Sequence, residues 1–160
     1  MLKILATICI IGMATSSCTS KKASRTESSH EAEPELTMIV GTYTSGDSKG
    51  LYSFRFNEEN GTATALSEAE VENPSYLVPS ADGKFIYAVS EFSNDQAAAN
   101  AFAFNKEEGT FRLLNTQKTE GEDPCYIITN GSNVITANYS GGSISVFPID
   151  KDGSLLPAST

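Results

Sequence analysis

The sequence predicts an all-β protein of the β-propeller class, comprising about two and a half blades. Three observations support this prediction: a strand-turn-strand stretch occurs twice, a third alternating strand occurs three times, and both recur at one spacing. The spacing is roughly 48 residues with four strands per unit, and propeller blades run about 40–50 residues with four strands each. A chain of this kind places copies of one module around a shared axis.

The first copy of the repeat runs from Asn73 to Glu91 and reads as two strands joined by a turn. Residues 76–78 are apolar, and residues 85–89 alternate and are rich in β-branched and aromatic side chains. Asp82-Gly83 lies between the two strands and predicts a tight hairpin turn, because Gly supplies the positive φ that such turns require. We therefore expect an antiparallel hairpin here.

The same pattern returns about 50 residues later, within the range of one blade period. Residues 123–128 repeat the order found at 73–78: a polar residue, Pro, a small residue, Tyr and two aliphatic residues. The third strand of each unit alternates, ends in Asn or Asp, and is followed by a Gly that starts the turn into a fourth strand. Its copies are residues 51–57, 99–105 and 143–150, and the glycines are Gly61, Gly109 and Gly153.

These repeats give a strand map for residues 36–160. The first blade has strands at about 35–43, 50–57 and 63–69, the second at 75–80, 85–92, 98–106 and 110–118, and the third at 125–130, 133–139, 142–150 and from 154 onward. The first blade lacks its innermost strand. Propellers close by combining strands from both ends of a chain in one blade, which leaves no open edge. We therefore expect this chain to be the N-terminal part of a longer propeller, and to be unstable and inactive alone.

Residues 1–35 do not belong to the predicted propeller. A basic start and an apolar run at 4–14 are typical of a signal peptide, which we assign to residues 1–17. Residues 15–18 resemble a bacterial lipoprotein cleavage box in which Cys18 receives the lipid, although Thr15 departs from the usual aliphatic residue. An ordinary secretory signal with an incidental Cys is the alternative. Residues 18–35 are polar and lack any apolar period, as in a flexible tether.

The composition excludes several classes of function. A net charge of −9, from 11 Lys and Arg against 20 Asp and Glu, argues against nucleic acid, whose binding depends on cations that neutralise phosphates. We expect contact with a membrane only through the lipid anchor, and no metal or cofactor, because the sequence has no zinc spacing or phosphate loop. No internal disulfide is expected, since Cys9 lies in the signal peptide and Cys18 at the lipid site. Cys125 is interpreted as a small core residue.

Polar residues gather in the loops that enter each innermost strand and leave each second strand. Because these two strands are antiparallel, the loops lie at the same end of the sheet, where a polar mouth would bind a small ligand. The residues that we expect to face the ligand are Tyr43, Asn73, Tyr76, Glu91, Tyr126, Asn138 and Tyr139. Glu91 and Asp123 are the candidates for a general base. The alternative is structural: Asn73 and Asp123 are also turn residues before Pro.

Several motifs, in the same order, resemble the seven-bladed lactonase family. They lie at residues 41–46, 73–77, 80–89, 114–117, 123–126 and 137–146. This family is typified by the propeller-type 6-phosphogluconolactonase and is related to fungal carboxymuconate cyclase. The resemblance implies a ring of seven blades and hydrolysis of a sugar lactone, with 6-phosphogluconolactone as the family's name substrate.

Two departures shape the expected function. Tyr126 stands where many members of the family have His after a Pro-Cys pair, and the later blades, with their His and Arg residues, are absent from this sequence. An exported lipoprotein of the periplasm or outer membrane would not meet cytosolic sugar phosphates. We therefore expect an unphosphorylated sugar lactone or a related acid as substrate. The alternatives are a non-catalytic exported propeller that binds carbohydrate or a protein partner, and a cytosolic enzyme like the family's name member. The oligomeric state stays open.

Overall fold

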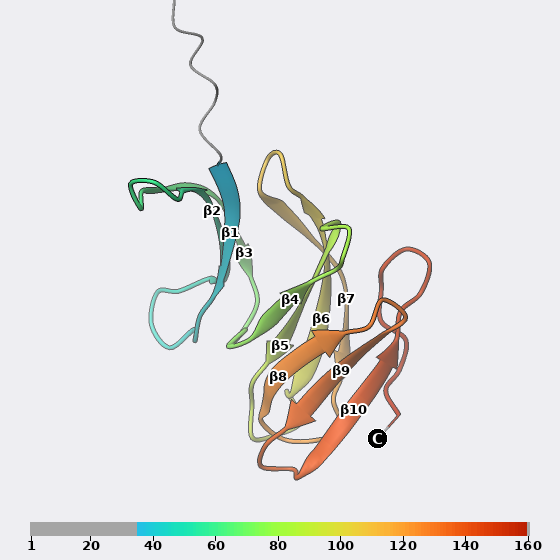
Figure 1. Cartoon of the computed structure of the whole chain (residues 1–160). Helices are drawn as coiled ribbons and strands as arrows, with labels where there is room; N and C mark the ends of the chain where they lie inside the picture. Colours follow the sequence, from blue (N-terminus) through green and yellow to red (C-terminus); the bar gives the residue numbers. More distant parts are fainter. Residues whose placement is uncertain (1–34, 160) are drawn as a thin grey trace, which may run out of the picture. The chain divides into compact units, whose positions relative to one another are not determined.

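The computed structural model describes residues 35–159, where ten strands form three antiparallel sheets and no helix occurs (Figure 1). The strands are β1 (Glu35–Gly41), β2 (Gly50–Asn57), β3 (Ala63–Glu70), β4 (Leu77–Pro79), β5 (Phe85–Ser90), β6 (Ala98–Asn105), β7 (Thr110–Lys118), β8 (Pro124–Thr129), β9 (Asn133–Asn138) and β10 (Ser143–Pro148). The expectations for the signal peptide, Cys18 and the tether fall on residues that lie outside the described part. In residues 35–159, no helix is long and apolar enough to cross a membrane.

The three sheets correspond to the three predicted blades. The first blade has the order β1-β2-β3, the second β4-β5-β6-β7, and the third β8-β9-β10. Among the described residues β1 pairs only with β2, so the first blade lacks its innermost strand, as predicted. The predicted fourth strand of the third blade is present only as two isolated bridges, Ile149 with Leu155 and Val146 with Ser159.

The turn from the third to the fourth strand of the repeat has the same construction in the first and second blades. Gly61 and Gly109 both have φ of 71°, and their N–H groups donate to the carbonyls of Asn57 and Asn105 at 2.9 and 2.7 Å. In the third blade Gly153 has φ of 88°, and its N–H donates to the carbonyl of Asp150 at 3.0 Å, so this turn is one residue shorter. A left-handed residue is required at this point of the turn, which explains why the repeat places Gly there.

The turn between β4 and β5 differs from the predicted two-residue hairpin. Residues 80–84 form a longer loop, in which Gly83 has φ of 69° and Asp82 does not have positive φ. The Asp82 carboxylate accepts hydrogen bonds from the Ser80 hydroxyl at 2.7 Å and the Lys84 amide at 3.1 Å. Asp82 therefore closes an Asx turn with its side chain and needs no left-handed backbone.

The core lies between blades. One apolar cluster joins the first blade to the second, and its buried members are Leu51, Ile86, Ala88 and Phe102. A second cluster joins the second blade to the third, and its buried members are Tyr87, Val89, Ala99, Ala101, Ile127, Val134, Phe147 and Leu155. Alternate residues of β5 thus enter different clusters, because successive side chains of a strand point to opposite faces.

Hydrogen bonds from hydroxyl groups also join neighbouring blades. In the second blade the carbonyl of Gly109 accepts from Ser53 Oγ at 2.6 Å and Ser67 Oγ at 3.0 Å, both in the first blade. In the third blade the carbonyl of Gly153 accepts from Tyr87 Oη at 3.2 Å, in the second blade. The turn glycines of the second and third blades are therefore also contacts with the preceding blade.

Candidate functional site

The loops that enter the innermost strand and leave the second strand meet at one end of each blade, as the strand order predicts. In the second blade the Glu91 amide donates to the Asn73 carbonyl at 3.0 Å. In the third blade the Tyr139 amide donates to the Asp123 carbonyl at 2.9 Å. These bonds fix the backbone of both loops, so the side chains that they carry are held by the strands of the blade.

Asn73 and Asp123 join each blade to the preceding one. Both have left-handed backbones, with φ of 47° and 53°. Asn73 Oδ1 accepts from the Thr44 amide at 3.0 Å, and Asp123 Oδ1 accepts from Ser93 Oγ at 2.7 Å. Hydrogen bonds from the Ser140 and Ser93 hydroxyls lower the pKa of Asp123. A carboxylate with a lowered pKa is a weaker base, so these contacts favour the structural role for Asp123.

Glu91 is the centre of a polar cluster that three segments build. Tyr43, two residues after β1, donates its hydroxyl to Glu91 Oε2 at 3.0 Å, and Ser75, two residues before β4, donates to the same oxygen. The hydrogen bond to Glu91 is the main cause of the raised pKa of Tyr43, followed by partial burial and the charge of the carboxylate. Among the described residues, Glu91 Oε1 accepts no hydrogen bond, so this oxygen is available to a ligand.

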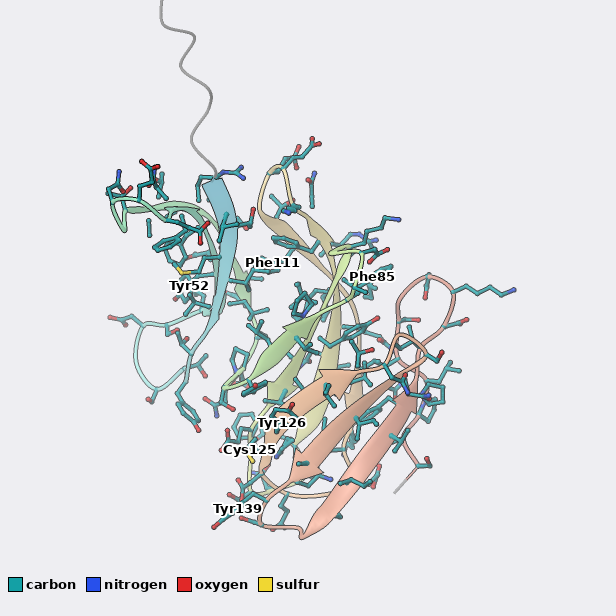
Figure 2. The ribbon with its side chains drawn as sticks, in the orientation of Figure 1. Tyr52, Phe85, Phe111, Cys125, Tyr126 and Tyr139 are labelled. Atoms are coloured by element: carbon teal, nitrogen blue, oxygen red, sulfur yellow. The ribbon has the colours of Figure 1, made fainter. Side chains whose placement is uncertain are left out.

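Tyr76 and Tyr126 form an aromatic pair, and Tyr76 directly follows Ser75 of this cluster in the sequence. Their ring centroids are 4.8 Å apart and their planes are inclined by 52°. Each side chain is 42% exposed, although the backbones are fixed: the Tyr76 carbonyl accepts from the Val89 amide, and Tyr126 pairs with Ala137 of β9. Figure 2 shows Tyr126 and Cys125 together near the start of β8. Tyr126 thus lies in β8 and Tyr76 directly precedes β4, so both half-exposed rings are carried by backbone that hydrogen bonds fix.

The prediction that Cys125 is a core residue is wrong, because its side chain is exposed. The pairing of β8 with β9 shifts register between Pro124 and Tyr126. Cys125 occupies this bulge and has no partner in the register, so it departs from the in-and-out alternation of the strand. The second blade has Ser75 at the same place of the repeated motif, where the small side chain reaches Glu91.

Asn138 and Tyr139 do not join the Glu91 cluster. Asn138 is buried, and its amide donates to Ser143 Oγ at 3.1 Å and Ser145 Oγ at 2.8 Å while its Oδ1 accepts from Thr136 Oγ1 at 3.0 Å. These bonds give Asn138 a structural role inside the third blade. The Tyr139 side chain is 81% exposed.

Ser75 is a residue of the site that the sequence analysis did not identify. The available signal was its position directly after Pro in the repeated motif, in a segment expected at the same end of the sheet as the loop that carries Glu91.

The candidate site is an exposed surface and not an enclosed cavity. A cavity of about 480 Å³ lies between β1 and β4 and reaches the loop 80–84, at the opposite end of β4 from Ser75. Ile39, Leu77, Ile86 and Phe104 contribute apolar walls to it. Within residues 35–159, no group of three or more His, Cys, Asp or Glu side chains is arranged to hold a metal ion. The polar groups that meet at Glu91 are its carboxylate and the hydroxyls of Tyr43 and Ser75.

Comparison with known proteins agrees with this architecture. Residues 37–160 match the family described as lactonase, 7-bladed beta-propeller. The chain is 38% identical to a 6-phosphogluconolactonase of Bacillus subtilis over 122 residues, which are 72% of this chain and 34% of that protein.

Solved structures are similar over the same region. The crystal structure of a Bacteroides fragilis protein shares 73% sequence identity with this chain. The TM-score is 0.78, and the match covers 79% of this chain and 35% of that one. A periplasmic gluconolactonase of Pseudomonas aeruginosa is 29% identical, with a TM-score of 0.73 over 79% of this chain and 38% of that one. The chain thus spans about a third of the length of these relatives. It belongs to the lactonase family of seven-bladed β-propellers.

Proposed function

We propose that the protein in its full natural length hydrolyses the lactone ring of a sugar at the end of the blades where Tyr43, Ser75 and Glu91 meet. The observation that carries the proposal is the Glu91 cluster, at the end of the sheets where loops converge in a chain of the lactonase family. Relatives named 6-phosphogluconolactonase and periplasmic gluconolactonase support the reaction class. Fold membership alone does not fix an activity, so the proposal depends on this site.

Glu91 is the residue that we propose as general base. Water would attack the lactone carbonyl carbon while Glu91 takes one of its protons. The new carbon–oxygen bond forms, the ring carbon–oxygen bond breaks, and the ring oxygen leaves as a hydroxyl after it gains a proton. Tyr43 and Ser75 both bond Oε2, which fixes the carboxylate and leaves Oε1 for the water.

The charges of the described part favour an unphosphorylated substrate. The two lysines near this end are paired with acids: Lys49 Nζ lies 2.8 Å from Glu70, and Lys118 Nζ lies 3.9 Å from Asp95. Glu91 adds a negative charge to the site, which would repel a phosphate group. We therefore propose a neutral sugar lactone as substrate, which also suits an exported protein.

Hydrolysis of δ-gluconolactone and of its 6-phosphate by the full-length protein tests the function. We expect the unphosphorylated lactone to be hydrolysed faster, and Glu91→Gln to lower kcat by roughly 10²-fold or more, the usual contribution of a general base. Glu59→Gln is the matched control, because Glu59 is exposed on the loop between β2 and β3. If neither lactone is hydrolysed above its spontaneous rate, the proposed activity is wrong.

A second candidate function is non-catalytic binding of carbohydrate or of a protein partner. It is favoured by one observation: the single His of the chain is His30, so residues 36–160 supply no imidazole for acid–base chemistry. A full-length protein that binds the lactone or its analogues without turnover would support this candidate against the hydrolase.

We also propose that the protein is exported and anchored by lipid at Cys18. The support is the apolar run at 4–14 followed by small residues before Cys18. Labelling of cells with a palmitate analogue tests it, with Cys18→Ala as the variant and Cys9→Ala as the control. We expect the label and membrane association to be lost only in Cys18→Ala. A label that persists in Cys18→Ala would contradict the anchor and leave an ordinary secretory signal.

A further inference from the structure

The Tyr76–Tyr126 pair has the features of a surface prepared for a ligand. Both rings are 42% exposed, and backbone hydrogen bonds hold the residues that carry them, so a ligand that covers the rings does not have to order this backbone. With centroids 4.8 Å apart and planes inclined by 52°, the two rings contact each other and form one continuous aromatic surface. Covering exposed aromatic rings of this kind with an apolar face of a ligand lowers the free energy of the complex.

The groups next to the pair are hydrogen-bonding groups. Ser75, which precedes Tyr76 in the sequence, donates to Glu91, whose second oxygen accepts no hydrogen bond from the described residues. A ligand over the rings would therefore need an apolar face for the tyrosines and a hydroxyl that can donate to Glu91. A sugar ring combines these features, since its C–H groups form apolar faces and its hydroxyls lie around the rim.

The charge of the surroundings separates neutral from phosphorylated sugars. Glu91 is the acid of this cluster, and the nearest lysines described above are occupied by Glu70 and Asp95. The negative charge of Glu91 would repel a phosphate placed near it.

We propose that Tyr76 and Tyr126 form a stacking platform for the ring of an uncharged sugar lactone, with Tyr126 as a specificity-determining residue beside Glu91. This inference rests on the proposed function and deepens it, because it names the surface that binds the ring of the neutral substrate. The platform positions the ring, and Glu91 faces the polar edge of that ring.

The test uses D-glucono-δ-lactam, an uncharged ring analogue that resists hydrolysis, with the full-length protein in isothermal titration calorimetry. We expect Tyr126→Ala to weaken lactam binding roughly tenfold, the scale of one aromatic contact, while Tyr126→Phe keeps wild-type affinity. Leu113→Ala is the control, because Leu113 is an exposed large side chain on β7, outside the cluster. The 6-phosphorylated lactam should bind more weakly than the neutral one.

The inference is overturned if wild type does not bind the lactam, if Tyr126→Ala binds it as wild type does, or if the phosphorylated lactam binds more tightly. It is also overturned if Tyr126→Phe loses as much affinity as Tyr126→Ala, because the ring would then not be the contact. Tyr126→Leu, which keeps apolar bulk, and urea denaturation of each variant separate lost stacking from misfolding. Platform-dependent lactam binding without lactone turnover would leave the platform standing and contradict only the proposed hydrolysis.

Discussion

The second and third blades come from the same repeat, but their strands are buried differently. In β5 every residue from Ile86 to Ser90 is buried, whereas in β9 buried and half-buried residues alternate. The second blade packs on both neighbours through two apolar clusters, and the third blade packs only on the second in the described chain. A strand with one covered face shows the period of two, and a strand with both faces covered loses it.

The same comparison explains where exposed apolar side chains occur. Ile128 and Ile144 of the third blade are 44% and 57% exposed, and they lie on the face opposite Ile127 and Phe147. The corresponding face of the second blade is covered, because Tyr87 and its neighbours contact the third blade. Repetition of a sequence therefore reproduces the strands but not their environment.

The largest expected effect comes from truncating the same side chain in the two environments. Ile86→Ala should lower the free energy of unfolding by about 2–5 kcal/mol, because Ile86 is 1% exposed and its loss leaves a cavity between blades. Ile144→Ala should change it by less than about 0.5 kcal/mol, since Ile144 is 57% exposed. Urea denaturation of this chain measures both. Equal losses would mean that the face of the third blade is covered in solution.

A smaller effect is expected from two glycines with the same backbone conformation. Gly61 and Gly109 both have φ of 71°, so alanine at either position carries a similar left-handed penalty of about 1–2 kcal/mol. At Gly61 an added Cβ meets nothing within 4 Å, whereas at Gly109 it would lie 2.6 Å from Leu66 Cδ1 and 2.8 Å from Ser53 Oγ, in the first blade.

Gly109→Ala should therefore cost about 1–3 kcal/mol more than Gly61→Ala, as expected for overpacking. Thermal or urea unfolding of the two variants measures the difference, which isolates the contact between blades from the turn itself. Identical losses would show that the turn conformation, and not the packing of the blades, selects Gly at this position.

The smallest effect that we expect is on the pH dependence of stability. The equivalent contacts between blades use the Asn73 amide in the second blade and the Asp123 carboxylate in the third. Hydrogen bonds from Ser140 and Ser93 lower the folded-state pKa of Asp123 below its unfolded value. The resulting stabilisation is fully present at pH values above the unfolded-state pKa of Asp, about 3.9, and is lost as the pH falls through the lower folded-state pKa. Asp123→Asn should therefore flatten the loss of stability in acid.

Asn73→Ala provides the matched comparison, since an amide does not titrate in this range. It should lower the free energy of unfolding by the same amount at pH 3 and pH 7. Chemical denaturation across this range measures both variants. A profile for Asp123→Asn as steep as that of wild type would contradict the assignment of Asp123 to this contact.

Sequence alone located most strands, because the repeated motifs mark their turns. The Gly that follows Asn57 and Asn105 by four residues predicted the third turn of each blade, and the structure has a hydrogen bond there in each copy. The length of the β4–β5 loop was not predictable. The Asp82 side chain closes this loop with hydrogen bonds, and the Asp-Gly pair in the sequence does not distinguish such a loop from a two-residue hairpin. Local patterns determine turns only where backbone conformation is the deciding term.

The candidate site could be predicted only to the level of which loops share an end. The antiparallel order of strands brought the loop after β5 beside the segment before β4, so Glu91 was a candidate from the start. Its partners come from elsewhere: Tyr43 lies 48 residues away in sequence and Ser75 lies 16 residues away. No local signal distinguishes Ser75, which reaches Glu91, from Cys125, which is exposed in a bulge at the same place of the motif.

The amino-acid sequence determined the module of this protein: four strands, their turns, and the end at which polar loops gather. These features depend on alternation and on glycine at left-handed positions, which are local properties of the chain. Only the tertiary structure decided which strand is buried on both faces, that Asn138 is internal, and that Tyr76 meets Tyr126. Those outcomes depend on which blade packs against which, since burial and contact at a distance are set by the neighbouring sheet and not by the strand's own residues.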